Sequence, residues 1–456
     1  MCSSDLVEAA AREFEKETGE RVQLQYGGSG TLLGNLRVAK AGDVYVPADE
    51  SYIDAGRGFG VLAEVVPLAR QRPVILVAKG NPKGVRAMED LWREGVRVSF
   101  ANPEAASVGR SVRALLQASG RWEALEKRVA VFKPTVNDVA NDVKLGAVDA
   151  GVVWDALAAQ YPDLEVVRLP EFDAAAETLH AAVLMSSQRP TSALRFVRFL
   201  AARDRGARLF AANGYEAVPG DAWVLAPEIT FFSGSMLRPG VEATLREFEA
   251  REGCRITTVY NGCGILCAQM RAGERPDAYL SCDTTFMESV ADLYAAPADV
   301  VDNNLMIIVQ KGNPKGIATA ADLAKPGVRV GLPHHDKSAM GNVAWKMLVK
   351  MGLYDAIAAN MVVESPTGDF LVNQIRTGSL DAIIACRTNY KQVSDTLDAL
   401  PIDHPMAAMT QPFAVGKDTP HAQMMRRLLD AIVSTTGRER FEKAGFGWRY
   451  QAPAGK

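Results

Sequence analysis

The feature that most constrains this chain is an internal repeat that spans nearly all of its 456 residues. Residues 79–84 (KGNPKG) return unchanged at 311–316, an offset of 232, and residues 43–49 (DVYVPAD) are matched by 277–283 (DAYLSCD) at 234. Chance similarity would not keep the offset between matching segments nearly constant over such distances. The chain therefore reads as a tandem duplication of a unit of roughly 225 residues, joined near 219–227, and each copy is too long for a solenoid repeat.

A glycine-rich turn recurs within the repeat. Residues 26–33 (YGGSGTLL) and 260–266 (YNGCGIL) each run from a strand end through glycines into a helix start. In the first copy, the Ser29 hydroxyl and the unpaired N–H groups of a helix N-terminus could bind an oxyanion. A flexible turn, with Ser29 bonded to its own helix, is the alternative interpretation.

Alternating strand and helix patterns predict an α/β fold with mainly parallel sheets. In the first copy the expected helices are 7–18, 31–40, 110–119 and 136–145, and the expected strands are 22–26, 43–46, 73–78, 96–100, 130–132 and 150–154. Asp49 and Asp283 are expected to cap the helices that follow them. The composition is ordinary for a globular protein, with 48% hydrophobic and 23% charged residues. The net charge of −3 gives no reason to expect nucleic-acid binding. No apolar run is long enough to span a membrane.

The beginning of the chain differs from the beginning of the second copy. A strand at 228–232 precedes the first helix of the second copy, whereas the first copy starts directly with its helix and shows no signal peptide. We expect that the N-terminal strand of the first copy is missing. The absence of a targeting segment then carries no information about location.

Taken together, these motifs resemble the type II periplasmic solute-binding fold, and within it the molybdate- and tungstate-binding receptors of ABC transporters. The resemblance rests on the Gly-Ser-Gly turn, the segment 43–49, the Asn-Pro-Lys-Gly turn and the run from Val136 to Trp154. It implies two tandem units, each built from two three-layer α/β lobes that close on a tetrahedral oxyanion held by hydroxyl and backbone N–H donors. The implied boundaries are 1–223 for the first domain (lobe one 7–78 and 180–223, lobe two 79–179) and 227–456 for the second (lobe one 227–309 and 405–456, lobe two 310–404).

The resemblance also implies which residues would hold the ligand. In the first copy they are Ser29, Val108, Val136 and Trp154, the last standing where the family usually has a tyrosine; in the second copy they are Ser235, Cys263, Met340, Gly368 and Cys386. It implies an extracytoplasmic or periplasmic receptor that works with an ABC permease, without catalytic residues, metal or cofactor. Two alternatives are a sensor that uses the same fold, for which no DNA-binding or membrane segment is evident, and an enzyme with Cys263 or Cys386 as nucleophile, for which no general base is well placed.

Five of the six cysteines lie in the second copy, and their odd count fits no standard disulfide framework or zinc pattern. Cys263 and Cys267, one helical turn apart, are expected to be buried apolar residues, with a redox pair or a thiophilic site that includes Cys386, His334 or His335 as the alternative. If the copies superpose, Cys263 and Cys386 face each other beside Met340. That arrangement predicts either a soft, sulfur-rich site or a cleft that has lost binding.

Overall fold

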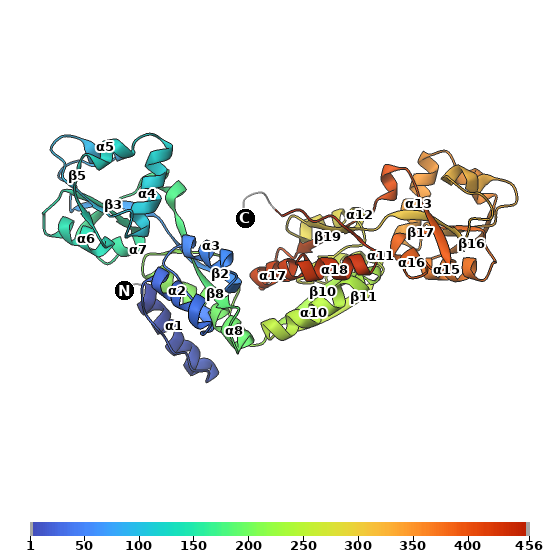
Figure 1. The fold of residues 1–456 in the computed structure, drawn as a ribbon, viewed down its shortest axis with the longest axis horizontal. Coiled ribbons are helices and arrows are strands. Elements are labelled where there is room, and N and C mark those ends of the chain that lie inside the picture. The colour runs from blue at the N-terminus through green and yellow to red at the C-terminus, as the bar shows by residue number, and fades with distance from the viewer. Residues whose placement is uncertain (1–2, 453–456) are drawn as a thin grey trace. The chain divides into compact units, whose positions relative to one another are not determined.

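The computed structural model describes residues 3–452, and the chain divides into two compact units, Met1–Leu225 (unit 1) and Ala226–Lys456 (unit 2) (Figure 1). Each unit contains two separate sheets, so the described chain has four. The prediction of a tandem α/β protein with two lobes per unit is confirmed, but the expectation of mainly parallel sheets is wrong, because most strand pairings within residues 3–452 are antiparallel. None of the helices within residues 3–452 is long and apolar enough to cross a membrane.

The first lobe of unit 1 is an antiparallel sheet in the order β1-β8-β2-β9. Its strands are β1 (Val44–Tyr45), β2 (Leu62–Gln71), β8 (Glu177–Leu184) and β9 (Glu216–Ala217); its helices are α1 (Ser3–Thr18), α2 (Ser29–Ala39), α3 (Glu50–Gly58), α8 (Pro190–Ala201) and α9 (Gly206–Ala212). Successive strand residues point to opposite faces of a sheet. Val183 accordingly packs with α1 and α8, whereas Leu184 packs with α2, which gives three layers.

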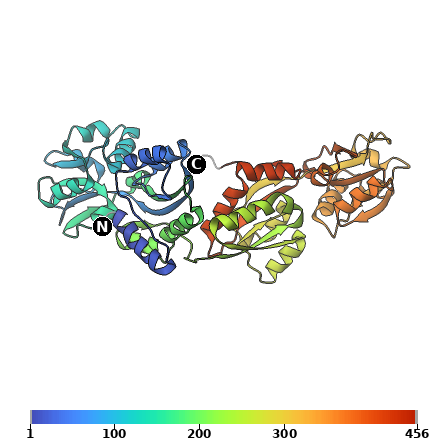
Figure 2. The ribbon, with the colours of Figure 1, turned by 60° about the horizontal axis from the view of Figure 1, so that its bottom comes forward.

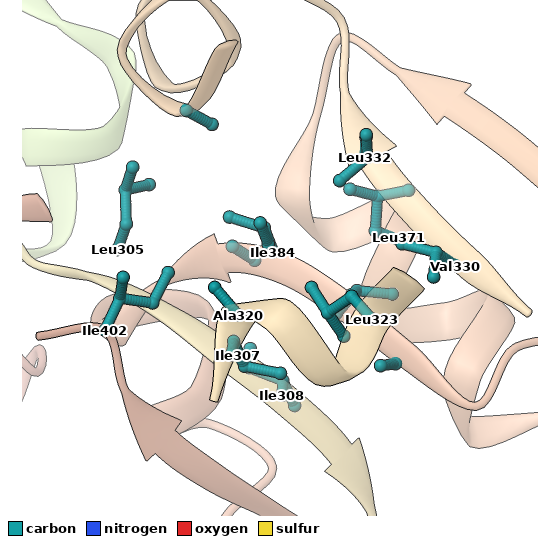
Figure 3. Packing of buried hydrophobic residues seen from close by; sticks show 14 of the residues in the cluster. Leu305, Ile307, Ile308, Ala320, Leu323, Val330, Leu332, Leu371, Ile384 and Ile402 are labelled. Atoms are coloured by element: carbon teal, nitrogen blue, oxygen red, sulfur yellow. The ribbon is translucent and has the colours of Figure 1, made fainter. Parts of the chain in front are cut away.

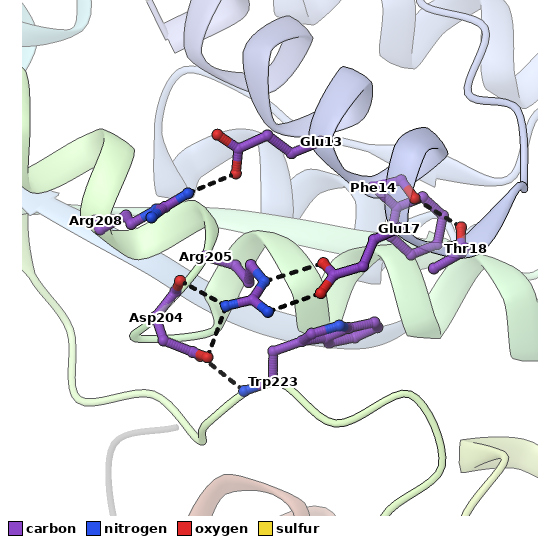
Figure 4. A network of polar contacts seen from close by, with 8 residues as sticks. All are labelled: Glu13, Phe14, Glu17, Thr18, Asp204, Arg205, Arg208 and Trp223. Atoms are coloured by element: carbon purple, nitrogen blue, oxygen red, sulfur yellow. Dashed lines mark hydrogen bonds and ion pairs between the residues drawn. The ribbon is translucent and has the colours of Figure 1, made fainter.

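Helix α1 is held to the end of unit 1 by polar contacts as well as by its apolar face. Glu17 accepts two hydrogen bonds from Arg205, at 2.7 and 3.0 Å, and Glu13 pairs with Arg208 at 3.0 Å (Figure 4). Phe14 is fully buried against Phe196 and Phe199. These contacts join segments about 190 residues apart in the chain.

The second lobe of unit 1 is a five-stranded sheet in the order β5-β4-β6-β3-β7. Strands β5, β4 and β6 are parallel, and β3 and β7 complete the sheet in antiparallel pairings. The strands are β3 (Pro73–Ala78), β4 (Val98–Ala101), β5 (Val129–Lys133), β6 (Ala150–Trp154) and β7 (Leu164–Val167); the helices are α4 (Ser107–Ala118), α5 (Trp122–Glu126), α6 (Val136–Lys144) and α7 (Asp155–Ala158), with short 3₁₀ segments η1 (Met88–Trp92) and η2 (Pro170–Ala175).

The first lobe of unit 2 has a six-stranded sheet in the order β11-β10-β12-β19-β13-β20. Its strands are β10 (Glu228–Gly234), β11 (Arg255–Asn261), β12 (Ala278–Leu280), β13 (Ala298–Asp302), β19 (Thr410–Val415) and β20 (Gly447–Trp448); its helices are α10 (Arg238–Glu252), α11 (Cys263–Arg271), α12 (Thr284–Glu288), α17 (Ala422–Ile432) and α18 (Thr435–Lys443), with η3 (Ser235–Leu237) and η4 (Ala291–Leu293). Phe231 packs on the side of α10 and α17, whereas Phe232 packs on the side of α11, so helices cover both faces (Figure 2).

The second lobe of unit 2 repeats the second lobe of unit 1, in the order β16-β15-β17-β14-β18. Its strands are β14 (Leu305–Gln310), β15 (Val330–Pro333), β16 (Met361–Ser365), β17 (Ala382–Cys386) and β18 (Leu397–Pro401); its helices are α13 (Ala339–Lys350), α14 (Tyr354–Ala358), α15 (Gly368–Arg376) and α16 (Arg387–Lys391), with η5 (Ala320–Ala324) and η6 (Pro405–Ala407). Leu305, Ile307 and Ile384 lie in its apolar core (Figure 3).

Two strands lie in a different lobe from the one expected. Strand β3, expected to close lobe one at residue 78, pairs with β6 and β7 in the second lobe, and β14, expected to lie in lobe one up to residue 309, pairs with β17 and β18. The chain therefore crosses between lobes at Arg72 and at 303–304. The ten-residue strand β2, which the sequence analysis did not predict, carries the chain to the first of these crossings.

The strand expected at 22–26 does not form. Among residues 3–452, its counterpart in unit 2, β11, pairs with β10 alone, and no strand in this range pairs with residues 21–27. A strand without a neighbour leaves its backbone hydrogen-bonding groups to water and gains no ladder. The alternating sequence at 22–26 is therefore not sufficient to form a strand.

Candidate functional site

Sheet topology brings the expected second-lobe residues together in each unit. In unit 1, the adjacent parallel strands β5, β4 and β6 lead to Val136, Val108 and Trp154. In unit 2, β16, β15 and β17 lead in the same way to Gly368, Met340 and Cys386. Carboxyl ends of parallel strands meet at one edge of a sheet, where ligands of open α/β folds bind.

Ser29 is the first residue of α2 and is only partly buried. Its Oγ accepts a hydrogen bond from the Ala48 N–H at 3.0 Å, and its carbonyl accepts one from the Tyr45 hydroxyl at 2.8 Å. Within residues 3–452, no group accepts the hydroxyl hydrogen of Ser29. Because the N-cap residue is Gly28, no side chain covers the first-turn N–H groups of α2 either.

An ion pair joins the two lobes of unit 1 next to this helix. Asp49 caps α3, accepting from the Ser51 N–H at 3.0 Å, which confirms its expected capping role. Its other oxygen lies 3.1 Å from an Arg110 nitrogen of α4. Ala48 is hydrogen-bonded to Ser29 of α2, and the next residue, Asp49, pairs with Arg110 in the first turn of α4, so residues 48–49 connect the starts of the two helices across the junction.

The N-terminus of α4 is also free of a capping side chain. Its N-cap residue is Ala106, which offers no side-chain acceptor, and Val108 in the first turn is buried. Unpaired first-turn N–H groups and the helix dipole both favour a negative charge at such an end. Unit 1 thus presents two uncapped helix N-termini, one from each lobe.

Glu177, at the start of β8 where the chain returns to the first lobe, adds a carboxylate to the junction. It accepts hydrogen bonds from the Ser111 hydroxyl of α4 and, at 3.5 Å, from the Glu50 N–H. Burial raises the pKa of Glu177, and the neighbouring Asp49 charge raises it further. The charge at the junction therefore depends on the protonation state of this group.

The other two expected residues of unit 1, Val136 and Trp154, also belong to the second lobe. Val136 begins α6, where Thr135 caps the helix by accepting from the Asp138 N–H at 3.2 Å. Trp154 is 6% exposed and packs in the core of the lobe. No residue in the described range accepts from its indole N–H, so that donor is compatible with a ligand role.

Unit 2 differs from unit 1 at the position of Ser29. Cys263, its counterpart, is linked to Cys282 by a disulfide bond, and Cys282 stands at the position of Ala48. The Cys282 N–H also lies 3.0 Å from Cys263 Sγ, as the Ala48 N–H lies 3.0 Å from Ser29 Oγ, so the disulfide bond adds a covalent link to the equivalent hydrogen bond. The expectation that the cysteines fit no disulfide is wrong for this pair, and Cys263 has no thiol with which to bind a ligand.

The first of the two alternatives for unit 2, a soft, sulfur-rich lining, does not form. Cys386 ends β17 inside the apolar core of the second lobe, and burial raises the pKa of its thiol to about 12. Met340 is 9% exposed and belongs to the same core. With Cys263 in a disulfide and Cys386 buried as a neutral thiol, no pair of thiols faces across the junction of unit 2. Neither residue is an accessible nucleophile.

One helix N-terminus of unit 2 is capped where its counterpart in unit 1 is not. Ser338, at the position of Ala106, caps α13 by accepting from the Gly341 N–H at 2.9 Å. Gly368 begins α15 in contact with the Asn389 amide, which donates to Asp369 at 2.9 Å. Ser235, at the end of β10, is exposed.

Arg110, Glu177 and Asn389 were not expected from the sequence to lie at these positions. Their contacts join positions that are distant in the chain, so no local motif identifies them. One signal was available: Ala106 and Ser338 occupy equivalent positions of the repeat, and only serine is a good N-cap.

Comparison with known proteins agrees with this architecture. The family described as "Bacterial extracellular solute-binding protein" matches the chain twice, over residues 3–216 and 229–447. The molybdate-binding protein ModA of Mycobacterium tuberculosis is 30% identical over 200 residues, covering 43% of this chain and 74% of ModA. A putative binding protein of Haemophilus influenzae is 25% identical over 210 residues, covering 46% of this chain and 85% of that protein.

Solved structures with a similar fold include a substrate-binding domain of a putative molybdenum ABC transporter from Clostridium difficile and the periplasmic molybdate-binding protein of Azotobacter vinelandii. The first is 17% identical with a TM-score of 0.42 and covers 49% of this chain and 100% of that one. The second is 14% identical with a TM-score of 0.40 and covers 48% and 99%. Each spans about half of this chain. By the family matches over both halves, the chain belongs to the bacterial extracellular solute-binding proteins and carries two such units in tandem.

Proposed function

We propose that the chain is the periplasmic or extracytoplasmic receptor of an ABC transporter, and that unit 1 binds a tetrahedral oxyanion such as molybdate or tungstate. The observation that carries the proposal is the pair of uncapped N-termini of α2 and α4, from opposite lobes, next to the Asp49–Arg110 ion pair. Ser29 and the backbone around Val108 and Val136 supply hydroxyl and N–H donors, and Trp154 supplies an indole N–H. Similarity to ModA of M. tuberculosis supports this class of ligand.

The donor set suits a fully ionised oxyanion. Neutral donors satisfy the ligand's oxygens without adding a counter-charge, and each helix end contributes roughly half a positive charge. Arg110 is already paired with Asp49, so it joins the lobes rather than neutralising the ligand. The disulfide of unit 2 fits an oxidising compartment outside the cytosol, because such bonds are rare in reducing ones.

Unit 2 contributes differently in this proposal. Its counterpart of Ser29 is in a disulfide, the first turn of α13 is capped by Ser338, and Asn389 contacts the start of α15. Around Ser235, Met340 and Gly368, unit 2 therefore lacks a hydroxyl at the position of Ser29 and has no uncapped N-terminus at the position of α4. We expect unit 1 to be the tighter oxyanion site.

Calorimetric titration of the full chain with molybdate, tungstate, sulfate and phosphate tests this function. Losing a hydrogen bond to a charged ligand costs about 1.5–3 kcal/mol, so Ser29→Ala is expected to weaken binding roughly 10- to 150-fold. Ser119→Ala, at the opposite end of α4, is the matched control and leaves affinity unchanged. Binding of none of the four anions, or equal affinity in Ser29→Ala and the native chain, contradicts the proposal.

A further inference from the structure

A cluster of two histidines and two carboxylates lies in unit 2 and has no role in the oxyanion proposal. His334, His335 and Asp336 follow the end of β15, and one ligand atom from each lies within 4.8 Å of the others. Glu364 on the neighbouring strand β16 reaches the same place, because its register partner is Leu332, two residues before His334. The cluster is assembled by sheet pairing as well as by sequence.

The contacts orient the His335 ring. Its Nδ1 lies 3.2 Å from Glu364 Oε1, and its Nε2 lies 3.1 Å from Asp336 Oδ2. Trp345 of α13 packs against the same ring, with centroids 5.7 Å apart. A histidine held through Nδ1 by a carboxylate, with Nε2 beside a second ligand, has the arrangement that metal-binding histidines adopt.

We propose that His334, His335 and Asp336 bind a divalent transition-metal ion such as Zn²⁺, with Glu364 as the positioning residue for His335. Two ligand atoms on a tetrahedral zinc ion, each about 2.1 Å from the metal, lie roughly 3.4 Å apart, close to the separation of His335 Nε2 and Asp336 Oδ2. Imidazole with carboxylate suits zinc, cobalt or nickel, whereas Mg²⁺ and Ca²⁺ prefer all-oxygen sites.

His334 presents its Nε2, which lies 3.9 Å from Glu364 Oε2. Its Nδ1 accepts a long hydrogen bond, 3.3 Å, from the Asp336 N–H. Metal binding at Nε2 places the ring proton on Nδ1, which then no longer accepts from the Asp336 N–H. The hydrogen bond is thus lost when the metal–ligand bond forms. The fourth coordination position is left to water, since the Asp336 side chain is 74% exposed.

The repeat provides an internal negative control. At the offset of 232, Asn102, Pro103 and Glu104 stand in place of the two histidines and Asp336, and Phe132 stands in place of Glu364. Unit 1 therefore lacks the imidazoles and the positioning carboxylate. The proposal predicts one strong site per chain rather than two.

The site is continuous with the start of α13. The His334 carbonyl accepts from the Ser338 N–H at 3.2 Å, and Ser338 caps the helix. A Cβ at Gly341 would lie 2.1 Å from the same carbonyl, so the helix is packed tightly on the ligand loop. A metal ion bound here fixes the loop from which α13 begins.

Titration of the EDTA-treated full chain with ZnCl₂ near neutral pH tests the proposal. One saturable site per chain is expected, and His335→Ala and His334→Ala each weaken it by more than the roughly 10- to 100-fold expected for Glu364→Gln. Co²⁺, used as a spectroscopic probe, is expected to give the visible bands of a nitrogen- and oxygen-bound ion, which His335→Ala removes. His404→Asn, which keeps a capping side chain on η6, is the control and leaves the affinity unchanged.

Circular dichroism of the metal-free variants separates loss of a ligand from loss of fold. The altered side chains lie in a partly exposed loop and at one strand position, so each metal-free variant is expected to melt as the native chain does. The proposal is overturned by the absence of saturable Zn²⁺ binding, or by affinities within twofold of native in both histidine variants. If Glu364→Gln retains native affinity, Glu364 has no positioning role.

Discussion

Removing the disulfide of unit 2 is expected to lower the stability of that unit by an amount set by the length of the loop that the disulfide closes. Cys263 and Cys282 are 19 residues apart, and closing a loop of that length is worth about 3 kcal/mol through the unfolded state. The double variant Cys263→Ser/Cys282→Ala reproduces the Ser29–Ala48 pair of unit 1. Its serine keeps an acceptor for the N–H of residue 282, so the loss is expected to be that of the loop constraint alone.

Hydrogen exchange followed by mass spectrometry measures this loss unit by unit. A decrease of about 3 kcal/mol raises the exchange rates of the most protected amides of unit 2, such as those of β12 and β19, by roughly 100- to 200-fold. Unit 1 holds no cysteine between residues 3 and 225, so its peptides are an internal control that does not change. Unchanged exchange in unit 2, or peptide mapping that finds Cys263 and Cys282 unlinked in the native chain, refutes the reasoning.

Three further predictions concern buried charge and close packing. Burial raises the pKa of Glu177 above its usual value near 4.5, so protonated Glu177 stabilises the native state below that value, and this stabilisation is lost as pH rises through the folded-state pKa. Glu177→Gln is expected to lack that pH-dependent loss of stability. A stability–pH profile of Glu177→Gln that keeps the native slope contradicts the assignment. Glu252 is 1% exposed and paired with Arg427 at 2.6 and 3.0 Å, so Arg427→Ala should lower the unfolding free energy of unit 2 by about 3–5 kcal/mol in urea denaturation, with Arg426→Ala on the same helix as control. A Cβ on Gly109 would lie 2.2 Å from the Ala101 carbonyl oxygen, so Gly109→Ala should destabilise unit 1 by about 1–3 kcal/mol, whereas Gly34→Ala, with open space around it, should not.

Sequence alone determined the features that depend on local pattern and on the repeat. A nearly constant offset established the duplication, and alternating strand and helix patterns established the α/β class. Asp49 and Asp283 were expected to cap helices, and both do so: Asp283 accepts from the Phe286 N–H at 3.0 Å. Capping involves residues within three or four positions of each other, so short-range sequence contains the necessary information.

Tertiary structure alone decided which distant residues meet. The pairing of Cys263 with Cys282, the contact of Asp49 with Arg110 and the approach of Glu364 to the histidines each depend on neighbouring strands or on the lobe junction. The alternating pattern at 22–26 forms no strand because a strand needs a partner that the pattern does not specify. Likewise β3 and β14 read as strands from their sequences, but only their hydrogen-bonded neighbours place them in the second lobes. Local sequence sets which secondary structure a segment can form, whereas its neighbours in space decide which hydrogen bonds and ion pairs it makes.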